Sequence, residues 1–174
     1  MAIITIHPGV VFGSFSPTSS PTAASSSSSS PLPLVGEVNA LATITGRTML
    51  ARSFAEGLGF KISRFSVGTA GYDPTDIAKS LPVDNTRTTL QSEIFSDTVD
   101  LVESPNTTGR SFYCRLQPTE ANHGLGEIGI WGEVVHSPEN PTEVGDFFLF
   151  ALVNQPFEGN NDDYTYIYRI VVQY

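Results

Sequence analysis

The chain has 174 residues, with 18 acidic and 9 basic side chains, and its formal net charge is −9. An acidic balance with only two lysines disfavours a protein that binds the phosphate backbone of nucleic acids. The single cysteine, Cys114, excludes an intramolecular disulfide and a zinc site built from several cysteines, and no apolar stretch approaches the roughly 20 residues that span a bilayer.

The charged residues are unevenly distributed along the chain. Residues 1–36 contain no Asp, Glu, Lys or Arg, so all 27 charged side chains lie in residues 37–174. We therefore divide the chain into an apolar anchoring arm at 1–13, a linker rich in Ser and Pro at 14–36, and one β-rich domain at 37–174, long enough for one hydrophobic core. The chain start lacks a positively charged region, so we expect cytoplasmic synthesis without a secretory signal.

The arm is apolar although a polar linker follows it. Its apolar side chains, several of them β-branched, are Ile3, Ile4, Ile6, Val10, Val11 and Phe12. A short apolar segment on an uncharged tether either packs on its own domain as an edge strand or adds a strand to a neighbouring subunit. Both alternatives stay open, and our working expectation is an arm that binds a partner.

The domain is predicted to begin with one helix. Thr45 is a potential N-cap, and Gly57 and Gly59 end the pattern. Gly46, near the start, lowers the helix propensity. Apolar side chains recur at helical spacing: Met49, Leu50, Phe54 and Leu58.

After the helix the pattern changes to β-structure. Residues 61–67 predict a strand closed by Gly68, and the polar residues 69–89 predict a functional or packing loop rather than a sheet element. Further strands are predicted at 92–102, 111–117, 127–136, 147–154 and 164–174. One helix followed by six strands predicts an α+β fold with a mainly antiparallel β-sheet or β-sandwich and an extended N-terminal arm.

Four features of the sequence are candidates for chemical sites. The glycines of 124–129 match G-x-G-x-x-G, but they lead into a predicted strand, whereas a dinucleotide site needs them to open a helix. Glu120 and His123 lack a second histidine motif, and the Asn/Asp turn at 160–163 lacks the spacing of an EF-hand. Cys114 has no obvious histidine partner and is expected to be a small buried hydrophobe. We therefore expect no catalytic residue, no metal site and no cofactor.

Several segments carry a family resemblance through their order in the chain. A helical segment at 51–57 leads into a strand that ends Gly68-Thr69-Ala70-Gly71, and Glu127-Ile128-Gly129-Ile130-Trp131 follows later. Residues 148–156 end in Asn154-Gln155-Pro156, and 168–173 form the closing strand. Over residues 46–174, this combination resembles the N-terminal attachment domain of bacteriophage tail fibres, the tail-collar fibre family.

The resemblance implies a structural, non-enzymatic role in a tailed-phage virion. The chain would be an adaptor or fibre-attachment subunit of the tail or baseplate, and its partners would be other tail or baseplate proteins and copies of itself, with a trimer favoured. Because the sequence stops where a fibre shaft would continue, an adaptor is expected rather than a complete fibre. The resemblance gives structural roles to Gly68, Gly71, Glu127, Gly129, Trp131, Asn154 and Pro156.

The residues of the 127–131 motif support such a role by their own chemistry. Gly129 permits close backbone approach beside the large side chain of Trp131. The carboxylate of Glu127 has several acceptor sites and is able to accept backbone N–H groups from a neighbouring loop. The alternative is an ordinary sheet with one packed tryptophan and an exposed acid.

A carbohydrate-binding β-sandwich that recognises a host surface is the alternative function. It requires exposed aromatic side chains for stacking on sugar rings, and the Asn/Asp turn at 160–163 as a calcium site. The candidate stacking residues are Tyr113, Trp131, Tyr164, Tyr166, Tyr168 and Tyr174.

Overall fold

The computed structural model describes residues 3–11, 38–106, 109–117, 120, 124–158 and 165–173. Phe12 and the linker expected at 14–36 lie outside these residues. Within them, one α-helix accompanies a large antiparallel sheet, so the predicted α+β class is confirmed.

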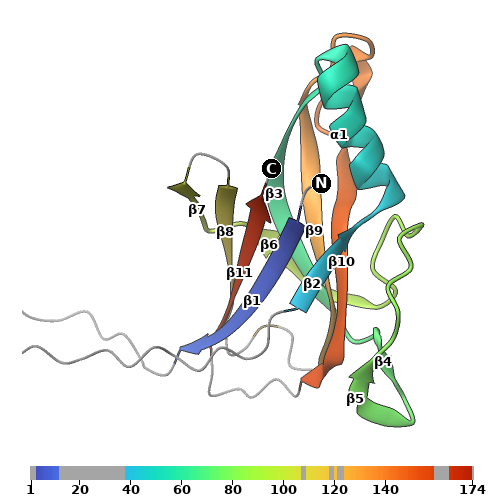
Figure 1. The fold of residues 1–174 in the computed structure, drawn as a ribbon, viewed down its shortest axis with the longest axis vertical. Helices are drawn as coiled ribbons and strands as arrows, with labels where there is room; N and C mark the ends of the chain where they lie inside the picture. Colours follow the sequence, from blue (N-terminus) through green and yellow to red (C-terminus); the bar gives the residue numbers. More distant parts are fainter. Residues whose placement is uncertain are drawn as a thin grey trace, which may run out of the picture.

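The sheet contains nine strands in the order β6-β3-β9-β10-β2-β1-β11-β8-β7 (Figure 1), and each neighbouring pair is antiparallel. A separate pair of strands, β4 and β5, lies beside β10. The helices are α1 (Ile44–Glu56) and the 3-10 turn η1 (Pro141–Glu143). The strands are β1 (Ile3–Val11), β2 (Val38–Ala42), β3 (Gly59–Gly68), β4 (Tyr72–Asp73), β5 (Asp76–Ser80), β6 (Glu93–Thr98), β7 (Leu101–Asn106), β8 (Gly109–Leu116), β9 (Leu125–His136), β10 (Phe147–Glu158) and β11 (Thr165–Gln173).

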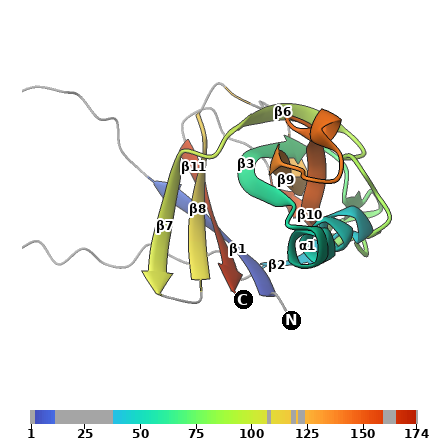
Figure 2. The same ribbon diagram turned by 90° about the horizontal axis from the view of Figure 1, so that it is seen from above.

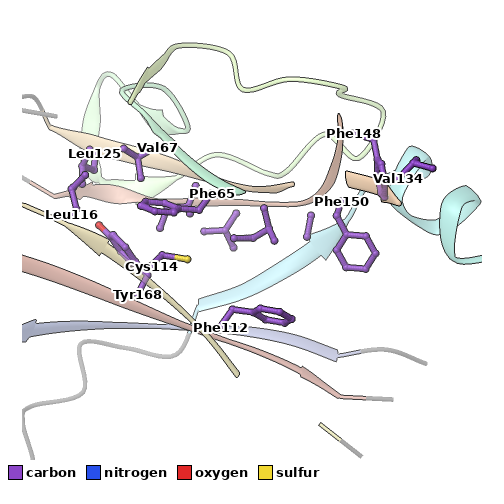
Figure 3. Close-up of a cluster of buried hydrophobic side chains, with 14 of the residues drawn as sticks. Phe65, Val67, Phe112, Cys114, Leu116, Leu125, Val134, Phe148, Phe150 and Tyr168 are labelled. Atoms are coloured by element: carbon purple, nitrogen blue, oxygen red, sulfur yellow. The ribbon is translucent and has the colours of Figure 1, made fainter. Parts of the chain in front are cut away.

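The sheet curls so that its two halves face each other across one core. Figure 2 shows β1, β11, β8 and β7 on one side, and β6, β3, β9 and β10 curving around the other. Side chains from both halves point toward each other in Figure 3, among them Phe65 and Val67 of β3 and Cys114 of β8. Tyr168 of β11 is fully buried in the same cluster. A single curled sheet therefore encloses the core as two packed sheets do in a β-sandwich.

The chain passes from one half to the other at a corner between β6 and β7. The sequence predicts one strand over 92–102, but β6 ends at Thr98 and β7 begins at Leu101. Val99 N donates to Ser63 O of β3 at 3.0 Å, whereas Asp100 N donates to Tyr113 O of β8 at 2.8 Å. Consecutive residues thus pair with opposite halves of the sheet, which a local sequence pattern does not reveal.

Helix α1 is capped by Thr43 rather than by Thr45. The Thr43 hydroxyl accepts from Gly46 N at 2.9 Å and donates to Leu149 O of β10, so it holds the helix start against the sheet. The predicted end is confirmed, because Gly57 is the C-cap with a φ of 71°. Phe54 does not belong to the buried face of the helix, since it is 83 % exposed.

The segment at 69–89 is only partly the loop that its polarity predicts. Within it, β4 and β5 form a small hairpin in which Asp73 pairs with Asp76. The Asp73 carboxylate accepts from the backbone N–H and the hydroxyl of Thr75, which stabilises the tight turn. The hydrogen bonds from Thr75, led by its hydroxyl, lower the pKa of Asp73.

We predict that Gly46→Ala destabilises the protein although alanine is the better helix former by about 1 kcal/mol. A Cβ at residue 46 would overlap the carbonyl group of Phe150, so the helix would have to move away from β10. We expect a loss of about 1–3 kcal/mol in the free energy of unfolding, measured by urea denaturation. Arg47→Ala, at the next and exposed position, is the control and should change it by less than about 0.5 kcal/mol. A Gly46→Ala protein more stable than the wild type would contradict this packing.

Candidate functional site

The residues of the family resemblance converge on the outer face of β3, β9 and β10. This face is crossed by residues 81–92, which we call the covering loop. Val83 and Leu90 of the loop pack on Trp131, Leu149 and Leu152, forming a second small core on the side of the sheet opposite the main one. The covering loop therefore gives the sheet apolar packing on both of its faces.

Glu127 is the buried acceptor that fixes the covering loop. It is 0 % exposed, and its Oε1 accepts from Ser92 N at 2.7 Å. Its Oε2 accepts from Gln91 N at 3.1 Å and from Arg87 Nη2 at 2.9 Å. The prediction that Glu127 accepts backbone N–H groups from a neighbouring loop is confirmed, and the ion pair with Arg87 compensates the burial of its charge.

Two glycines make room for this arrangement. A Cβ at residue 68 would lie 2.5 Å from both Glu127 Oε1 and Ser92 O, so only glycine fits beside the carboxylate. Gly71 has a φ of 97°, and a Cβ there would overlap the carbonyl oxygen of Gly126. At both positions a side chain would therefore collide with neighbouring atoms.

Trp131 is a packed residue rather than an exposed platform. Its side chain is 7 % exposed, and its indole Nε1 donates to Ser66 Oγ at 2.7 Å. The guanidinium of Arg64 lies over the ring, 4.9 Å from its centroid, and also pairs with Glu93 at 3.0 Å. Gly129 lies on the same face, and a Cβ there would overlap Leu90 of the covering loop.

Asn154 and Pro156 lie in the C-terminal part of β10. The Asn154 amide donates to Leu81 O and to Pro82 O, each at 3.2 Å, and so holds the start of the covering loop. Pro156 is exposed, and it lies where the β9–β10 register is interrupted between Asn154 and Glu158. A proline is tolerated there because it cannot donate to a regular ladder.

The covering loop also forms a hydrogen bond with the start of helix α1. Asn85 O accepts from Ile44 N at 2.8 Å, which joins the loop to the helix. The neighbouring Asp84 carboxylate accepts from Thr86 N at 2.9 Å and from the Thr86 hydroxyl at 2.7 Å. These hydrogen bonds, with the hydroxyl contributing most, lower the pKa of Asp84. The signal for this turn in the sequence is the Asp-x-Thr pattern of residues 84–86.

The N-terminal arm forms strand β1 within the sheet of its own chain. Its backbone pairs with β11 along the whole strand, from Ile3 opposite Gln173 to Val11 opposite Thr165. Its other side pairs with β2 between Ile4 and Ile6. The two alternatives for the arm were pairing with its own domain and binding to a partner. In the structure the arm pairs with its own domain, but it lies in the interior of the sheet rather than at an edge. Binding of residues 3–11 to a partner stays a prediction, and Phe12 is outside the described residues.

The other sequence patterns form no site in the described part of the chain. Residues from Leu125 onward lie in β9, as the strand interpretation of the 124–129 glycines predicts. Cys114 is fully buried on β8, and burial raises the pKa of its thiol. Among the residues described, no group of three His, Cys, Asp or Glu side chains is arranged to hold a metal ion. His123 and the turn at 160–163 fall outside them. No helix in the same ranges is long and apolar enough to cross a membrane.

Comparisons with protein-family models, with curated proteins and with solved structures give no match to this chain.

We predict that the acceptor oxygens of Glu127 stabilise the fold. In Glu127→Gln the side chain keeps its size, but one oxygen becomes an NH₂ group that faces N–H donors. We expect a loss of about 2–4 kcal/mol in the free energy of unfolding, measured by urea denaturation. The control is Glu139→Gln, which removes a charge at an exposed site and should have little effect. Equal stabilities of the two variants would contradict the role of Glu127.

A second prediction concerns acid stability. Because folding lowers the pKa of Asp84 below its unfolded value near 3.8, this group stabilises the fold above that pH. The contribution is lost as the pH falls through the folded pKa. In Asp84→Asn the ionisation is absent, so the difference in melting temperature from the wild type should shrink between about pH 5 and pH 2. A constant difference across this range would contradict the prediction.

Proposed function

We propose that this chain is a structural component of a tailed-phage virion that acts through protein–protein assembly. Its role would be that of an adaptor or fibre-attachment subunit of the tail or baseplate, without enzymatic activity. Its partners would be other tail or baseplate proteins and further copies of the chain, in the virion tail.

The observation that carries this proposal is the convergence of the resemblance residues. Gly68, Gly71, Glu127 and Asn154 come from β3, β9, β10 and the segment after β3, yet each contacts the covering loop or makes room for a group that does. Gly71 does so through its carbonyl oxygen, which accepts from Leu81 N at 2.8 Å. Each contact is structural, since it fixes backbone to backbone through a carboxylate or an amide. Residues used in this way suit a rigid attachment domain.

The sheet also supports assembly by strand addition. A strand from the arm lies between β2 and β11, although the linker separates it from the domain in sequence. The sheet therefore has an interior position that takes a segment tethered at a distance. Adding an extended segment to a sheet is a common way for proteins to bind one another.

The carbohydrate-binding alternative has less support. Stacking on a sugar requires an accessible aromatic face, but Trp131 is 7 % exposed and Tyr168 is 0 % exposed. Tyr164 and Tyr174 lie outside the described residues, as does the Asn/Asp segment at 160–163. We therefore do not propose this function.

We predict that purified particles of the phage encoding this chain contain it in a fixed copy number. Density-gradient-purified particles would be digested and analysed by quantitative mass spectrometry against the major capsid protein. We expect a copy number that is a small multiple of three or six, and particles from a gene-deleted phage should lack normal tails. Gradient-pure particles without the chain would overturn the proposal.

A further inference from the structure

We propose that the position between β2 and β11 accepts β1 from a second copy of this chain, so that neighbouring subunits are joined by exchanged strands. The inference deepens the proposed assembly function by naming the partner of the arm. It concerns the same contacts that the single chain makes, now supplied by another copy.

Strand β1 is an interior strand of the sheet, held there by backbone pairing with β2 and β11. All nine residues of β1 pair with β11, from Ile3 to Val11. This ladder leaves β11 with partners on both sides, since β8 pairs with its other edge. An empty position would expose a nine-residue edge over the main core, and such edges bind other strands readily.

Strand β1 joins the two halves of the sheet. On one side of the junction β2 pairs with β10 only at Leu41 and Ala42, and on the other it pairs with β1 only over Val38–Ala40. The long ladder of the junction is the one between β1 and β11. A β1 from another copy would therefore tie the two halves of one subunit together and link two subunits at the same time.

The connection between β1 and β2 is much longer than the pairing of these two strands requires. Antiparallel neighbours are commonly joined by two to five residues, whereas 26 residues (12–37) separate β1 from β2. A fully extended chain of that length reaches about 90 Å. A domain of this size has a radius of gyration of about 14 Å, so the tether is long enough to reach the sheet of an adjacent copy.

Exchange of β1 between two copies conserves its pairing with β2 and β11. The same backbone hydrogen bonds form whether β1 comes from the same or another chain, so only the entropy of the tether separates the two states. A strand tethered to its own domain has an effective concentration there on the order of millimolar. Pairing within one chain is favoured in dilute solution. The exchanged state becomes more populated as the protein concentration rises, and a closed ring of exchanged strands favours it further.

Exchange can be detected in the full chain with cysteines placed across the ladder. Thr5 lies opposite Val171, so Thr5→Cys with Val171→Cys should form a disulfide wherever β1 pairs with β11. Arg110 lies opposite Val172 on the other side of β11. Because pair types alternate along an antiparallel ladder, this pair is of the same type as Thr5–Val171, so Arg110→Cys with Val172→Cys is a matched control within the body of the domain. The native Cys114 is buried with a raised thiol pKa and stays out of the reaction.

Each variant would be unfolded in reductant, refolded at about 1 μM to 1 mM, oxidised, and separated on non-reducing denaturing gels. We expect the Thr5–Val171 pair to give single-chain cross-links at low concentration and covalent oligomers as the major product at high concentration. The control pair should stay within one chain throughout. Single-chain products alone at every concentration, or no cross-link at all, would overturn the exchange.

A mixing experiment excludes random disulfide formation. A chain carrying only Thr5→Cys and a differently tagged chain carrying only Val171→Cys would be refolded together at the highest concentration. Strand exchange predicts a mixed dimer at least about fivefold above either homodimer, and equal amounts would contradict it. Both experiments use purified protein, so their failure would leave the virion assignment standing, and absence from virions would leave strand exchange standing.

Discussion

The ladder between β1 and β11 is the interaction on which the closure of the sheet depends. It holds the half formed by β11, β8 and β7 beside β2, where the pairing with β10 is short. At the opposite end, the chain crosses from β6 to β7 through Val99 and Asp100, which bond to opposite halves. These two connections curl one sheet around one core, and the core contains side chains from both halves, including Phe65 and Tyr168.

On the outer face of the sheet, hydrogen bonds from side chains rather than strand pairing hold the chain in place. There the covering loop has no regular secondary structure, so its backbone groups need other partners. Glu127 accepts two of its N–H groups, the Asn154 amide binds two of its carbonyls, and Asn85 O accepts from Ile44 N at the start of α1. The glycines at 68 and 71 are required because a buried carboxylate and a close backbone occupy the space of a side chain.

Local patterns predicted the elements well where local forces determine them. The turn at Gly57 and the strands β3, β8, β9, β10 and β11 were all predicted to within a few residues, because glycine, alternation and turn chemistry act between neighbours. The errors arise where distant contacts prevail. Thr43 replaces Thr45 as the cap because its hydroxyl also reaches Leu149 O. Phe54 is exposed although it shares the apolar helical pattern with Met49, which packs against the main core.

The sequence by itself determined the class of the fold, the division by charge at residue 36 and the burial of Cys114, and it offered Glu127 as a possible acceptor. These follow from composition and from the chemistry of single residues. Only the tertiary structure decided that the apolar arm is an interior strand, that the predicted strand at 92–102 turns a corner, and that Trp131 packs under a loop. The physical reason is that strand order and burial depend on pairing between segments far apart in the chain, and the periodicity of one segment contains no information about its partner.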